Sequence, residues 1–241
     1  MEFDIKHLYQ VGLYSLYHVD EIDSTNTYFK NNFEFYLDNS VLQANHQSAG
    51  RGRYIRKWEN DEDDLCFSIL TYQRERYEIL TPLSVMNVLR KHHIKAFIKW
   101  PNDVYISNKK VCGILIEDIY QASMFKACII GIGINMTNKD EVNGIGLYSF
   151  QLKDKMMLLE EVLEELSLLK ESPFEEIIQE YTKNNLIYNR LIDFEGETLK
   201  VVSFSKEGYI IAVDNQGNNR IIKSDEINIK QSLKDDTWKN I

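Results

Sequence analysis

The sequence predicts an α+β fold in which helices flank a mixed β-sheet and a small all-β unit follows. Three observations lead to this prediction. Short runs of β-forming residues dominate positions 95–136, helical patterns flank them, and short alternating strands fill the chain after Asp193. Because hairpin turns join some of these strands, we expect a mixed sheet and not a purely parallel one.

The chain is expected to form two domains, residues 1–190 and residues 191–241. Its 241 residues lie between one and two average domains, and a hydrophobic share of 44% allows a substantial core. We expect the second domain to be a small β-barrel, because short strands follow one another at 199–204, 209–213, 219–222 and 226–229.

Strands and helices alternate in the first part of the larger domain. We expect strands at residues 14–22, 41–45 and 65–69. The last of these should be half-buried, because apolar residues alternate with polar or small ones. Asp23 to Asn26 offer N-cap residues for a helix over 27–37. Thr81-Pro82 predicts the first turn of a helix that ends near His93.

Four further strands and two helices complete the larger domain. The strands are expected at 96–100, 103–107, 111–119 and 124–134, with Asn108-Lys109 as the turn of a hairpin. Apolar residues spaced for one helical face predict an amphipathic helix over 156–170. Ser172-Pro173-Phe174-Glu175 predicts a capping box that opens another helix, ending near residue 189.

Composition and charge exclude several classes of protein. The formal net charge is −9, which disfavours nucleic acid as the main partner, because proteins that bind phosphate backbones usually carry a broad basic face. Cys66, Cys112 and Cys128 are widely spaced in apolar runs and predict buried thiols, not a zinc site or disulfides. The sequence has no signal-peptide pattern and no apolar run long enough to span a membrane, so we expect a cytoplasmic protein.

The most unusual stretch runs from Gln47 to Trp58, and we call it the basic loop. It carries four positive charges and no negative one, and glycines alternate with Arg51 and Arg53. Glycine lets the backbone approach a ligand closely, and arginine offers a planar charged fork for carboxylate or phosphate. The pattern indicates an anion-binding loop, although alone it also fits a solvated basic loop. We expect the acidic run from residue 59 to residue 64 to be solvated.

Two further segments could contribute to an anion site. Lys99 to Asp103 places a lysine, an amide and a carboxylate in a proline-containing turn, and Lys110 begins a strand close to Gly113. Gly131 and Gly133 lie in the next strand, where glycines permit close approach of a ligand or of packed side chains. We therefore expect one narrow cleft lined by backbone. No Walker-type motif, Rossmann turn or Ser-His-Asp order is present.

Five motifs in order make the sequence resemble the biotin protein ligase family. They are Ser24-Thr25-Asn26, Gln47 to Trp58, Lys99 to Asp103, Lys110 to Glu117 and Gly131 to Met136. The resemblance covers residues 14–137 closely, and the final segment is more loosely similar to the family's SH3-like C-terminal domain. It implies a ligase-only form without an N-terminal DNA-binding domain. One departure is Tyr54-Ile55, where the family usually has Arg-Gly, so the basic loop lacks a charge and a flexible residue.

The resemblance implies an ATP-dependent ligase that works in two steps. Biotin and MgATP form biotinyl-5′-AMP, and the biotinyl group then passes to a lysine of a biotin carboxyl carrier protein or domain of acetyl-CoA or pyruvate carboxylase. We assign Arg51, Arg53 and Lys110 the catalytic role of neutralising the two anions that react. Mg²⁺ would arrive with ATP, and Asp103 is the candidate for positioning it. The protein is expected to be a monomer or a homodimer.

Ligand contacts also follow from the resemblance. The residues expected to bind biotin are Ser24, Thr25, Asn26, Gln47, Arg51, Gly52, Arg53, Lys110, Gly113 and Ile114. Those expected to bind ATP or the adenylate are Arg53, Trp58, Lys99, Asn102, Asp103 and Asn135. Asn135 also fits the capping of a turn, and Ser24 and Thr25 also fit helix capping. Two alternatives stay open: a lipoate- or octanoate-protein ligase of the related fold, and a non-catalytic biotin sensor.

Overall fold

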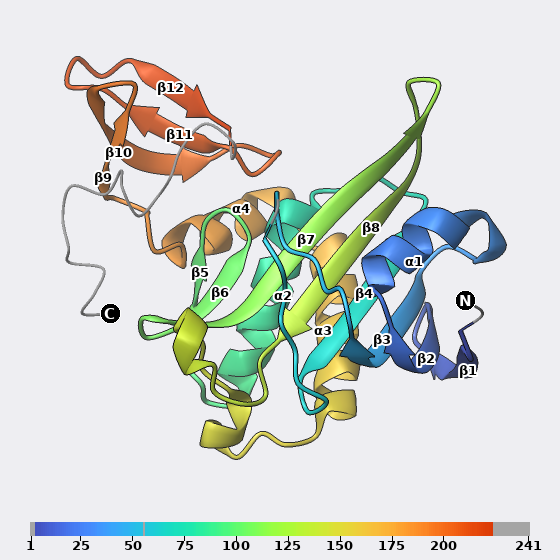
Figure 1. Cartoon of the computed structure of the whole chain (residues 1–241). Coiled ribbons are helices and arrows are strands. Elements are labelled where there is room, and N and C mark those ends of the chain that lie inside the picture. The colour runs from blue at the N-terminus through green and yellow to red at the C-terminus, as the bar shows by residue number, and fades with distance from the viewer. Residues whose placement is uncertain (1–2, 55, 224–241) are drawn as a thin grey trace.

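An eight-stranded sheet forms the centre of the larger unit. The computed structural model describes residues 3–54 and 56–223. The sheet has the order β1-β2-β3-β4-β8-β7-β6-β5, in which β2 and β3 run parallel and the other neighbours run antiparallel (Figure 1). Its strands are Lys6–Val11 (β1), Tyr14–Ile22 (β2), Ser40–Gln47 (β3), Leu65–Thr71 (β4), Ala96–Lys99 (β5), Asp103–Ile106 (β6), Lys109–Gln121 (β7) and Met124–Ile134 (β8). The predicted mixed sheet is confirmed.

Helices cover the two faces of the sheet unequally. They are Thr25–Asn32 (α1), Tyr77–Lys91 (α2), Lys155–Glu171 (α3) and Phe174–Lys183 (α4), and short 3₁₀ helices span Phe33–Phe35, Asp140–Val142 and Leu147–Phe150. The larger apolar cluster includes α2, α3 and α4 on one face, whereas α1 packs over β3, β4 and β8 on the other (Figure 1). The basic loop crosses that second face beside α1. None of the described helices is long and apolar enough to cross a lipid bilayer.

Alternation along the strands decides which side chains face each layer. Phe67 of β4 joins the cluster under α2, whereas Leu70 packs with Phe29 of α1. All seven residues of β4 are buried, so the predicted half-buried strand is wrong. The reason is that α1 also covers the second face, where Ser68 contacts the first turn of the helix.

The predicted strands within the described residues have counterparts with small shifts. The β6–β7 turn lies at Ser107-Asn108 and not at Asn108-Lys109, because Ser107 takes a left-handed conformation and Lys109 already pairs with Ile106. β1 is an additional strand that the sequence did not predict. Five of its six residues are exposed, so it lacks the apolar alternation that would mark it.

The predicted start of α2 at Thr81 is wrong by about one turn. The helix begins at Tyr77, and Pro82 lies inside it. Proline removes one backbone hydrogen bond to the carbonyl four residues earlier. Burial of Tyr77, Ile79 and Leu80 offsets that loss, since burying one large apolar side chain contributes about 1.5–3 kcal/mol.

Two other helices end earlier than the sequence predicted. α1 stops at Asn32 and continues as a 3₁₀ turn, and α4 stops at Lys183. The predicted capping box before α4 is wrong. Pro173 occupies the N-cap position, and the hydroxyl of Ser172 donates to the carbonyl of Leu168 at the end of α3, so it is not available to α4.

A four-stranded antiparallel sheet forms the C-terminal unit, in the order β12-β11-β10-β9. Its strands are Leu191–Phe194 (β9), Glu197–Phe204 (β10), Ile210–Val213 (β11) and Asn219–Ile222 (β12). This is the small β unit that the sequence predicted, consistent with an SH3-like domain, with β9 in addition. The strand predicted at 226–229 lies outside the described residues. The apolar face of the four-stranded sheet continues the main core, where Tyr181 packs edge-on against Phe204 with ring centroids 5.1 Å apart.

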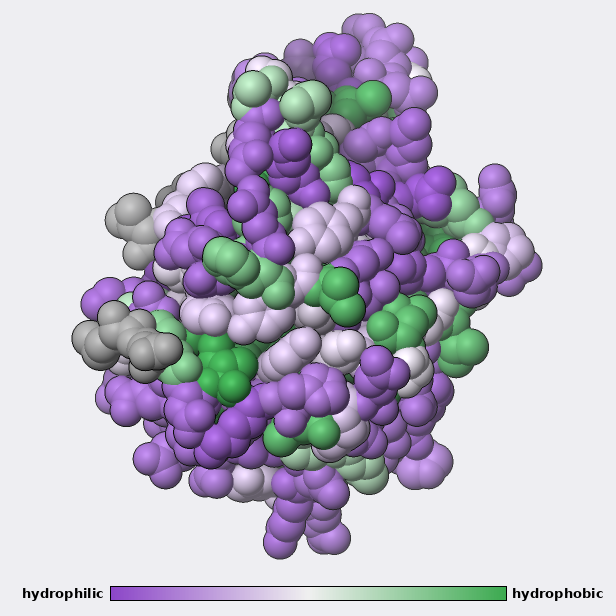
Figure 2. Space-filling view, turned by 90° about the vertical axis from the view of Figure 1, so that its right-hand side faces the viewer, coloured by the Kyte–Doolittle hydropathy of each residue, from purple (hydrophilic) through white to green (hydrophobic). Residues whose placement is uncertain are grey.

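The apolar side chains of the chain are mostly used inside this core. On the face shown in Figure 2, hydrophobic residues lie in small groups between hydrophilic ones. The predicted burial of the three cysteines is confirmed, and all are free thiols. Burial raises the pKa of Cys66 to about 12 and also raises the pKa of Cys112 and of Cys128, so these thiols are poor nucleophiles.

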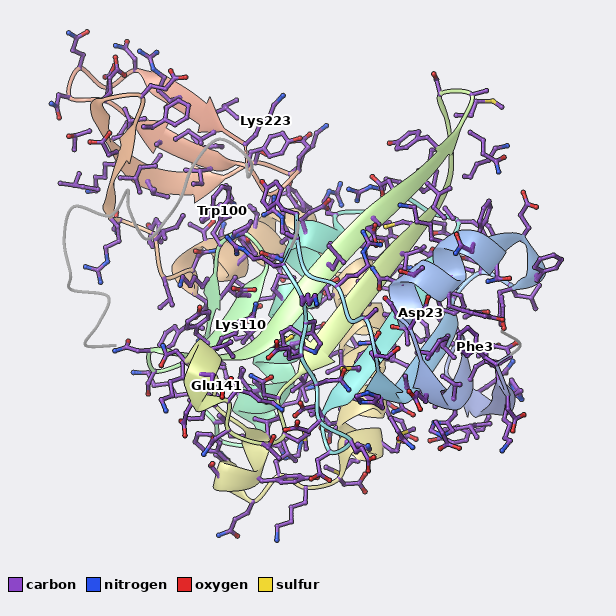
Figure 3. The ribbon with its side chains drawn as sticks, viewed as in Figure 1. Phe3, Asp23, Trp100, Lys110, Glu141 and Lys223 are labelled. Carbon is purple, nitrogen blue, oxygen red and sulfur yellow. The ribbon has the colours of Figure 1, made fainter. Side chains whose placement is uncertain are left out.

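A buried hydrogen bond ties the C-terminal unit to the larger sheet. Trp100, only 2% exposed, donates from Nε1 to the carbonyl oxygen of Gly208 at 2.8 Å. Gly208 lies between β10 and β11, and Figure 3 shows Trp100 on the side of the larger sheet that faces the C-terminal sheet. The segment predicted to be a functional turn is thus also a contact between the two units.

Trp100→Phe should lower the free energy of unfolding by about 1–2 kcal/mol, because it leaves the carbonyl of Gly208 without its buried donor. Denaturant unfolding monitored by circular dichroism measures the change. Tyr120→Phe, at a ring that is 58% exposed, is the matched control and should change stability by less than about 0.5 kcal/mol. Equal stability of Trp100→Phe and the wild type would contradict the hydrogen bond.

Candidate active site

A cavity of about 660 Å³ opens on the side of the sheet crossed by the basic loop, which passes in front of β7 (Figure 1). Its described lining includes one carboxylate and six basic side chains: Asp103, Arg51, Arg53, Arg56, Lys57, Lys99 and Lys110. The cavity is therefore locally positive although the chain as a whole carries −9. Such a cavity concentrates anionic ligands.

Gly131 and Gly133 of β8 let two side chains lie directly on the backbone of the sheet. A Cβ atom at Gly131 would overlap the amide of Asn26, and one at Gly133 would overlap the indole of Trp58. Of the two explanations that the sequence allowed, packing is the one that the geometry supports. These glycines are needed because side chains of the site occupy the space above them.

The first turn of α1 and the end of β3 form one wall of the cavity. Ser24 caps the helix by accepting a hydrogen bond from the backbone N–H of Thr27 at 3.4 Å. Gln47 Oε1 accepts from the backbone N–H of Thr25 at 2.9 Å and from its hydroxyl at 3.1 Å. Helix capping therefore also sets the directions of the polar groups that line this wall, together with Asn26.

Asn26 is fixed through both ends of its amide. Its Nδ2 donates to the carbonyl of Leu115 at 3.3 Å and to Glu117 Oε2 at 3.1 Å, and its Oδ1 accepts from Ser68 Oγ at 2.6 Å. Sequence reasoning missed Ser68 and Glu117. The alternation that sends Phe67 to the core indicates that Ser68 faces the cavity side, and the same rule applies to Glu117, two residues after Leu115.

The basic loop folds back on itself as a narrow hairpin. Trp58 N donates to the carbonyl of Gly50 at 3.0 Å, and Gly52 N donates to the carbonyl of Arg56 at 2.9 Å. Tyr54 near the tip has φ +58°, a left-handed conformation that residues with a side chain disfavour. The base of the loop is thus ordered by its own backbone, and Tyr54 has a disfavoured backbone conformation.

The two predicted arginines of the loop have different surroundings. Arg51 forms a two-pronged ion pair with Glu117, with Nη2–Oε1 at 3.1 Å and Nη1–Oε2 at 3.2 Å. The guanidinium of Arg53 lies 5.2 Å from the ring centroid of Tyr54, and its Nη2 donates to the Tyr54 hydroxyl at 3.4 Å. The charge of Arg51 is therefore matched by a carboxylate on β7, whereas Arg53 stacks on an aromatic ring within the loop.

Lys110 lies on the sheet beneath the loop (Figure 3). Its Nζ lies 2.6 Å from Asp103 Oδ1 and 5.4 Å from the centroid of the Trp58 ring. A carboxylate on one side and an aromatic face on the other both attract an ammonium group. The arrangement holds a positive charge at a fixed place in the cavity.

The turn between β5 and β6 is held to β7 by a reciprocal pair of hydrogen bonds. Ile114 N donates to the carbonyl of Asn102 at 3.0 Å, and Asn102 Nδ2 donates back to the carbonyl of Ile114. Lys99 Nζ donates to the hydroxyl of Tyr105 at 3.1 Å and lies 4.4 Å from its ring centroid. Burial raises the pKa of Tyr105, so its phenol stays neutral beside the lysine.

All predicted site residues except Asn135 line the cavity. Asn135 is 4% exposed, and its Nδ2 donates to the carbonyl of Lys110 at 3.0 Å, so it supports the backbone and does not face a ligand. Ile114 reaches the cavity wall through its backbone, because its side chain belongs to the core on the other face of the sheet. Leu115, which the sequence did not select, has the opposite orientation.

Part of the acidic run after the loop is structural. Asp64 is fully buried, and its Oδ1 accepts from the backbone N–H of Met136 at 2.8 Å. Its Oδ2 lies 2.8 Å from Lys139 Nζ, and Lys139 also pairs with Asp61. Although partial burial opposes its charge, these carboxylates raise the pKa of Lys139. The expectation that the run is solvated is therefore wrong for Asp64, which ties the end of the basic loop to the end of β8.

Comparisons with known proteins agree with this geometry. Residues 19–135 match the biotin/lipoate A/B protein ligase family. The biotin protein ligase of Aquifex aeolicus in complex with biotin and ATP is 29% identical, with a TM-score of 0.73 over 88% of this chain and 96% of that chain. A point mutant of the A. aeolicus ligase, in complex with biotin, is 30% identical, with a TM-score of 0.71 and the same coverage. The chain belongs to the biotin protein ligase family.

A curated relative in this family is the bifunctional ligase/repressor BirA of Salmonella typhimurium. It is 27% identical over 213 residues, and the match covers 81% of this chain and 66% of BirA. The chain thus spans just under two thirds of that relative's length. Of the Tyr54-Ile55 pair that the resemblance marks as a departure, Ile55 lies outside the described residues.

Alanine at each of the two β8 glycines tests separately the ligand contacts expected of Asn26 and of Trp58. Gly131→Ala should displace Asn26 and raise the Kd of biotin about tenfold, the effect of losing about one hydrogen bond. Gly133→Ala should displace Trp58 and weaken a nonhydrolysable ATP analogue by a similar factor. Calorimetric titration of each ligand measures both constants. The assignment fails if each substitution weakens both ligands equally.

Proposed function

We propose that this protein is an ATP-dependent biotin protein ligase. It would activate biotin to biotinyl-5′-AMP and transfer the biotinyl group to a lysine of a biotin carboxyl carrier protein or domain. The observation that carries the proposal is the cavity with six basic side chains, in a chain whose A. aeolicus relative is described in complex with biotin and ATP. Both substrates bring negative charge to the same place.

The first step demands charge neutralisation. A carboxylate oxygen of biotin attacks the α-phosphorus of ATP, and the bond to pyrophosphate breaks. Two like unit charges 4 Å apart repel by about 4 kcal/mol at an effective dielectric constant of 20. Lys110 and Arg53 are the side chains that we assign to this neutralisation, because a charge fixed before the reaction needs no reorganisation during it. The contacts of Lys110 with Asp103 and Trp58 support this role.

The wall at the start of α1 suits the neutral ureido ring of biotin. Such a ring requires hydrogen-bonding partners of fixed direction. The amide of Asn26 is oriented by Ser68 and Glu117, and that of Gln47 is oriented by Thr25. Ser24 lies at the same wall, and Gly52 and Gly113 contribute backbone to the same cavity. These groups would bind biotin at the end of the cavity away from Lys99.

ATP would occupy the part of the cavity bounded by Trp58, Lys99 and Asn102. Asp103 is the one carboxylate among the described lining residues, and it is paired with Lys110. The described residues contain no group of three or more His, Cys, Asp or Glu side chains suited to a metal ion. Mg²⁺ commonly keeps waters and binds through substrate phosphates, so this site fits Mg²⁺ held mainly by ATP, with Asp103 as the nearby carboxylate.

In the second step the amine of a carrier lysine attacks the acyl carbon of the adenylate, and AMP leaves. The carrier that we propose is the biotin carrier of acetyl-CoA or pyruvate carboxylase. We infer a cytoplasmic location, to which three free and buried thiols are suited because the cytosol keeps cysteines reduced. Lipoate or octanoate is the alternative substrate, since the matching family also includes lipoate ligases. Competition calorimetry with biotin and lipoate tests it.

Purified protein given biotin, ATP and Mg²⁺ should release pyrophosphate, and Lys110→Ala should reduce that rate by about 10²–10³-fold, the range for losing one preorganised electrostatic group. Lys109→Ala removes a neighbouring lysine that is 3.7 Å from Asp140, outside the cavity, and is the matched control. A wild-type rate in Lys110→Ala would remove Lys110 from the mechanism. Binding of biotin without any turnover in the wild type would support the sensor alternative.

Arg53→Gly should release biotinyl-5′-AMP before transfer, because the loop would lose the charge that holds the adenylate phosphate. The expected result is biotinylation of bystander proteins added to the assay, measured by streptavidin blotting. Arg76→Gly, which removes an arginine stacked on Phe174, is the control and should not label bystanders. Labelling confined to the carrier in Arg53→Gly would show that Arg53 does not retain the intermediate.

A further inference from the structure

Glu117 connects two parts of the site that the sequence places far apart. It lies on β7, where its backbone pairs with Ile129 of β8. Asn26 of α1 donates to its carboxylate at 3.1 Å, and Arg51 of the basic loop pairs with it at 3.1 Å. Lys30 of α1 lies 3.5 Å from the same group. One carboxylate therefore connects the sheet, the basic loop and α1, whose first turn forms the cavity wall proposed to bind biotin.

The surroundings of Glu117 make these contacts directional. Its side chain is 15% exposed, compared with 41% for Arg51. A carboxylate accepts about four hydrogen bonds, and the contacts of Arg51, Asn26 and Lys30 occupy those positions. Two parallel contacts to an arginine fix its guanidinium in position as well as in charge. The amide of Asn26 and the guanidinium of Arg51 are thus oriented by the same group.

This pairing alters what Arg51 can do for the reaction. Two parallel contacts to Glu117 hold its guanidinium against β7, so these N–H groups tie the loop to the sheet. Arg51 lines both the site cavity and an adjoining cavity of about 1020 Å³, and Glu117 lines the second. The ion pair consequently forms part of the wall between the two cavities and holds the loop against the sheet.

We propose that Glu117 is a positioning residue that anchors the basic loop through Arg51 and orients Asn26 for biotin. This proposal rests on the proposed function, and it revises the role of Arg51 from a cation that meets the reacting anions to an anchor of the loop. Binding of biotin and ordering of the loop are then coupled through one side chain. Lys110 and Arg53 remain the groups assigned to the chemistry.

Glu117→Ala should raise the KM for biotin about tenfold, because Asn26 loses a charged acceptor and the loop loses its anchor. At saturating biotin, kcat should fall less than about threefold, since Lys110 is unchanged. Glu117→Gln keeps an oxygen acceptor without the charge and should give an intermediate KM. A turnover rate lowered by about two orders of magnitude, with KM unchanged, would overturn the positioning role.

Because Arg51 and Glu117 form one ion pair, the increases in KM caused by Arg51→Ala and by Glu117→Ala should not multiply in the double variant. The double variant should match the more impaired single variant within about twofold in KM. If Arg51 instead touches the reacting anions, Arg51→Ala will lower kcat far more than Glu117→Ala does, and the double variant will show both losses. That result would overturn the anchor.

Trypsin provides a readout that does not depend on activity. Cleavage after Arg53, Arg56 and Lys57 should be about tenfold faster in Glu117→Ala than in the wild type, because local opening exposes the loop. Asp118→Ala is the matched control, since it removes a neighbouring carboxylate of β7 that pairs with Arg74 at 2.9 Å. Equal cleavage of both variants would overturn the anchor.

Trypsin cleavage also distinguishes failure of the proposed ligase function from failure of the positioning role of Glu117. If the wild type releases no pyrophosphate, the proposed function fails, while trypsin cleavage and calorimetric binding of biotin still test Glu117. If the wild type is active and Glu117→Ala matches it in KM and in cleavage rate, only the positioning role fails.

Discussion

Close packing of side chains on bare backbone is the constraint on which the site depends. Asn26 and Trp58 lie directly over Gly131 and Gly133, so the first turn of α1 and the end of the basic loop both come within contact distance of β8. Any larger residue in those two places would lift the helix or the loop away from the sheet. The positions of Asn26 and Trp58 above the sheet follow from this contact. The depth of the cavity is therefore set by residues that have no side chain.

Charge is the second constraint, because six basic side chains share one small cavity. Like charges repel, and the structure limits that cost by giving several of them local partners. Lys110 has Asp103, Arg51 has Glu117, and Lys99 lies on the ring of Tyr105. Some of these partners are carboxylates and others are aromatic rings, so basic side chains in the same cavity have different roles. A lysine between a carboxylate and an aromatic ring stays available to a ligand, whereas an arginine in a two-pronged pair is mainly a tie between elements.

The sequence predicted the sheet, the C-terminal β unit and most of the cavity because short motifs carry those features locally. It failed where tertiary contacts decide. Pro82 lies inside α2 because core burial outweighs a lost hydrogen bond, and Asp64 is buried because it accepts from the backbone at the end of β8. Glu117 was missed as a site residue because its partners lie 66 and 91 positions earlier in the chain. Asn135 supports the backbone beside the cavity. The sequence could not predict this role, because a polar residue at the end of a strand fits capping and ligand binding equally well.

The turn from Lys99 to Asp103 explains why the C-terminal unit matters to the site. Three contacts hold it: Trp100 donates to Gly208 between β10 and β11, Asn102 is hydrogen-bonded to Ile114 of β7, and Asp103 pairs with Lys110 of β7. A displacement of the C-terminal sheet would reach Asp103 through three residues of one short turn. Because Asp103 fixes the ammonium of Lys110, that displacement would also move the charge assigned to the chemistry. The smaller unit thus supports the site through the turn that carries Asp103, although it contributes none of the basic side chains that line the described cavity.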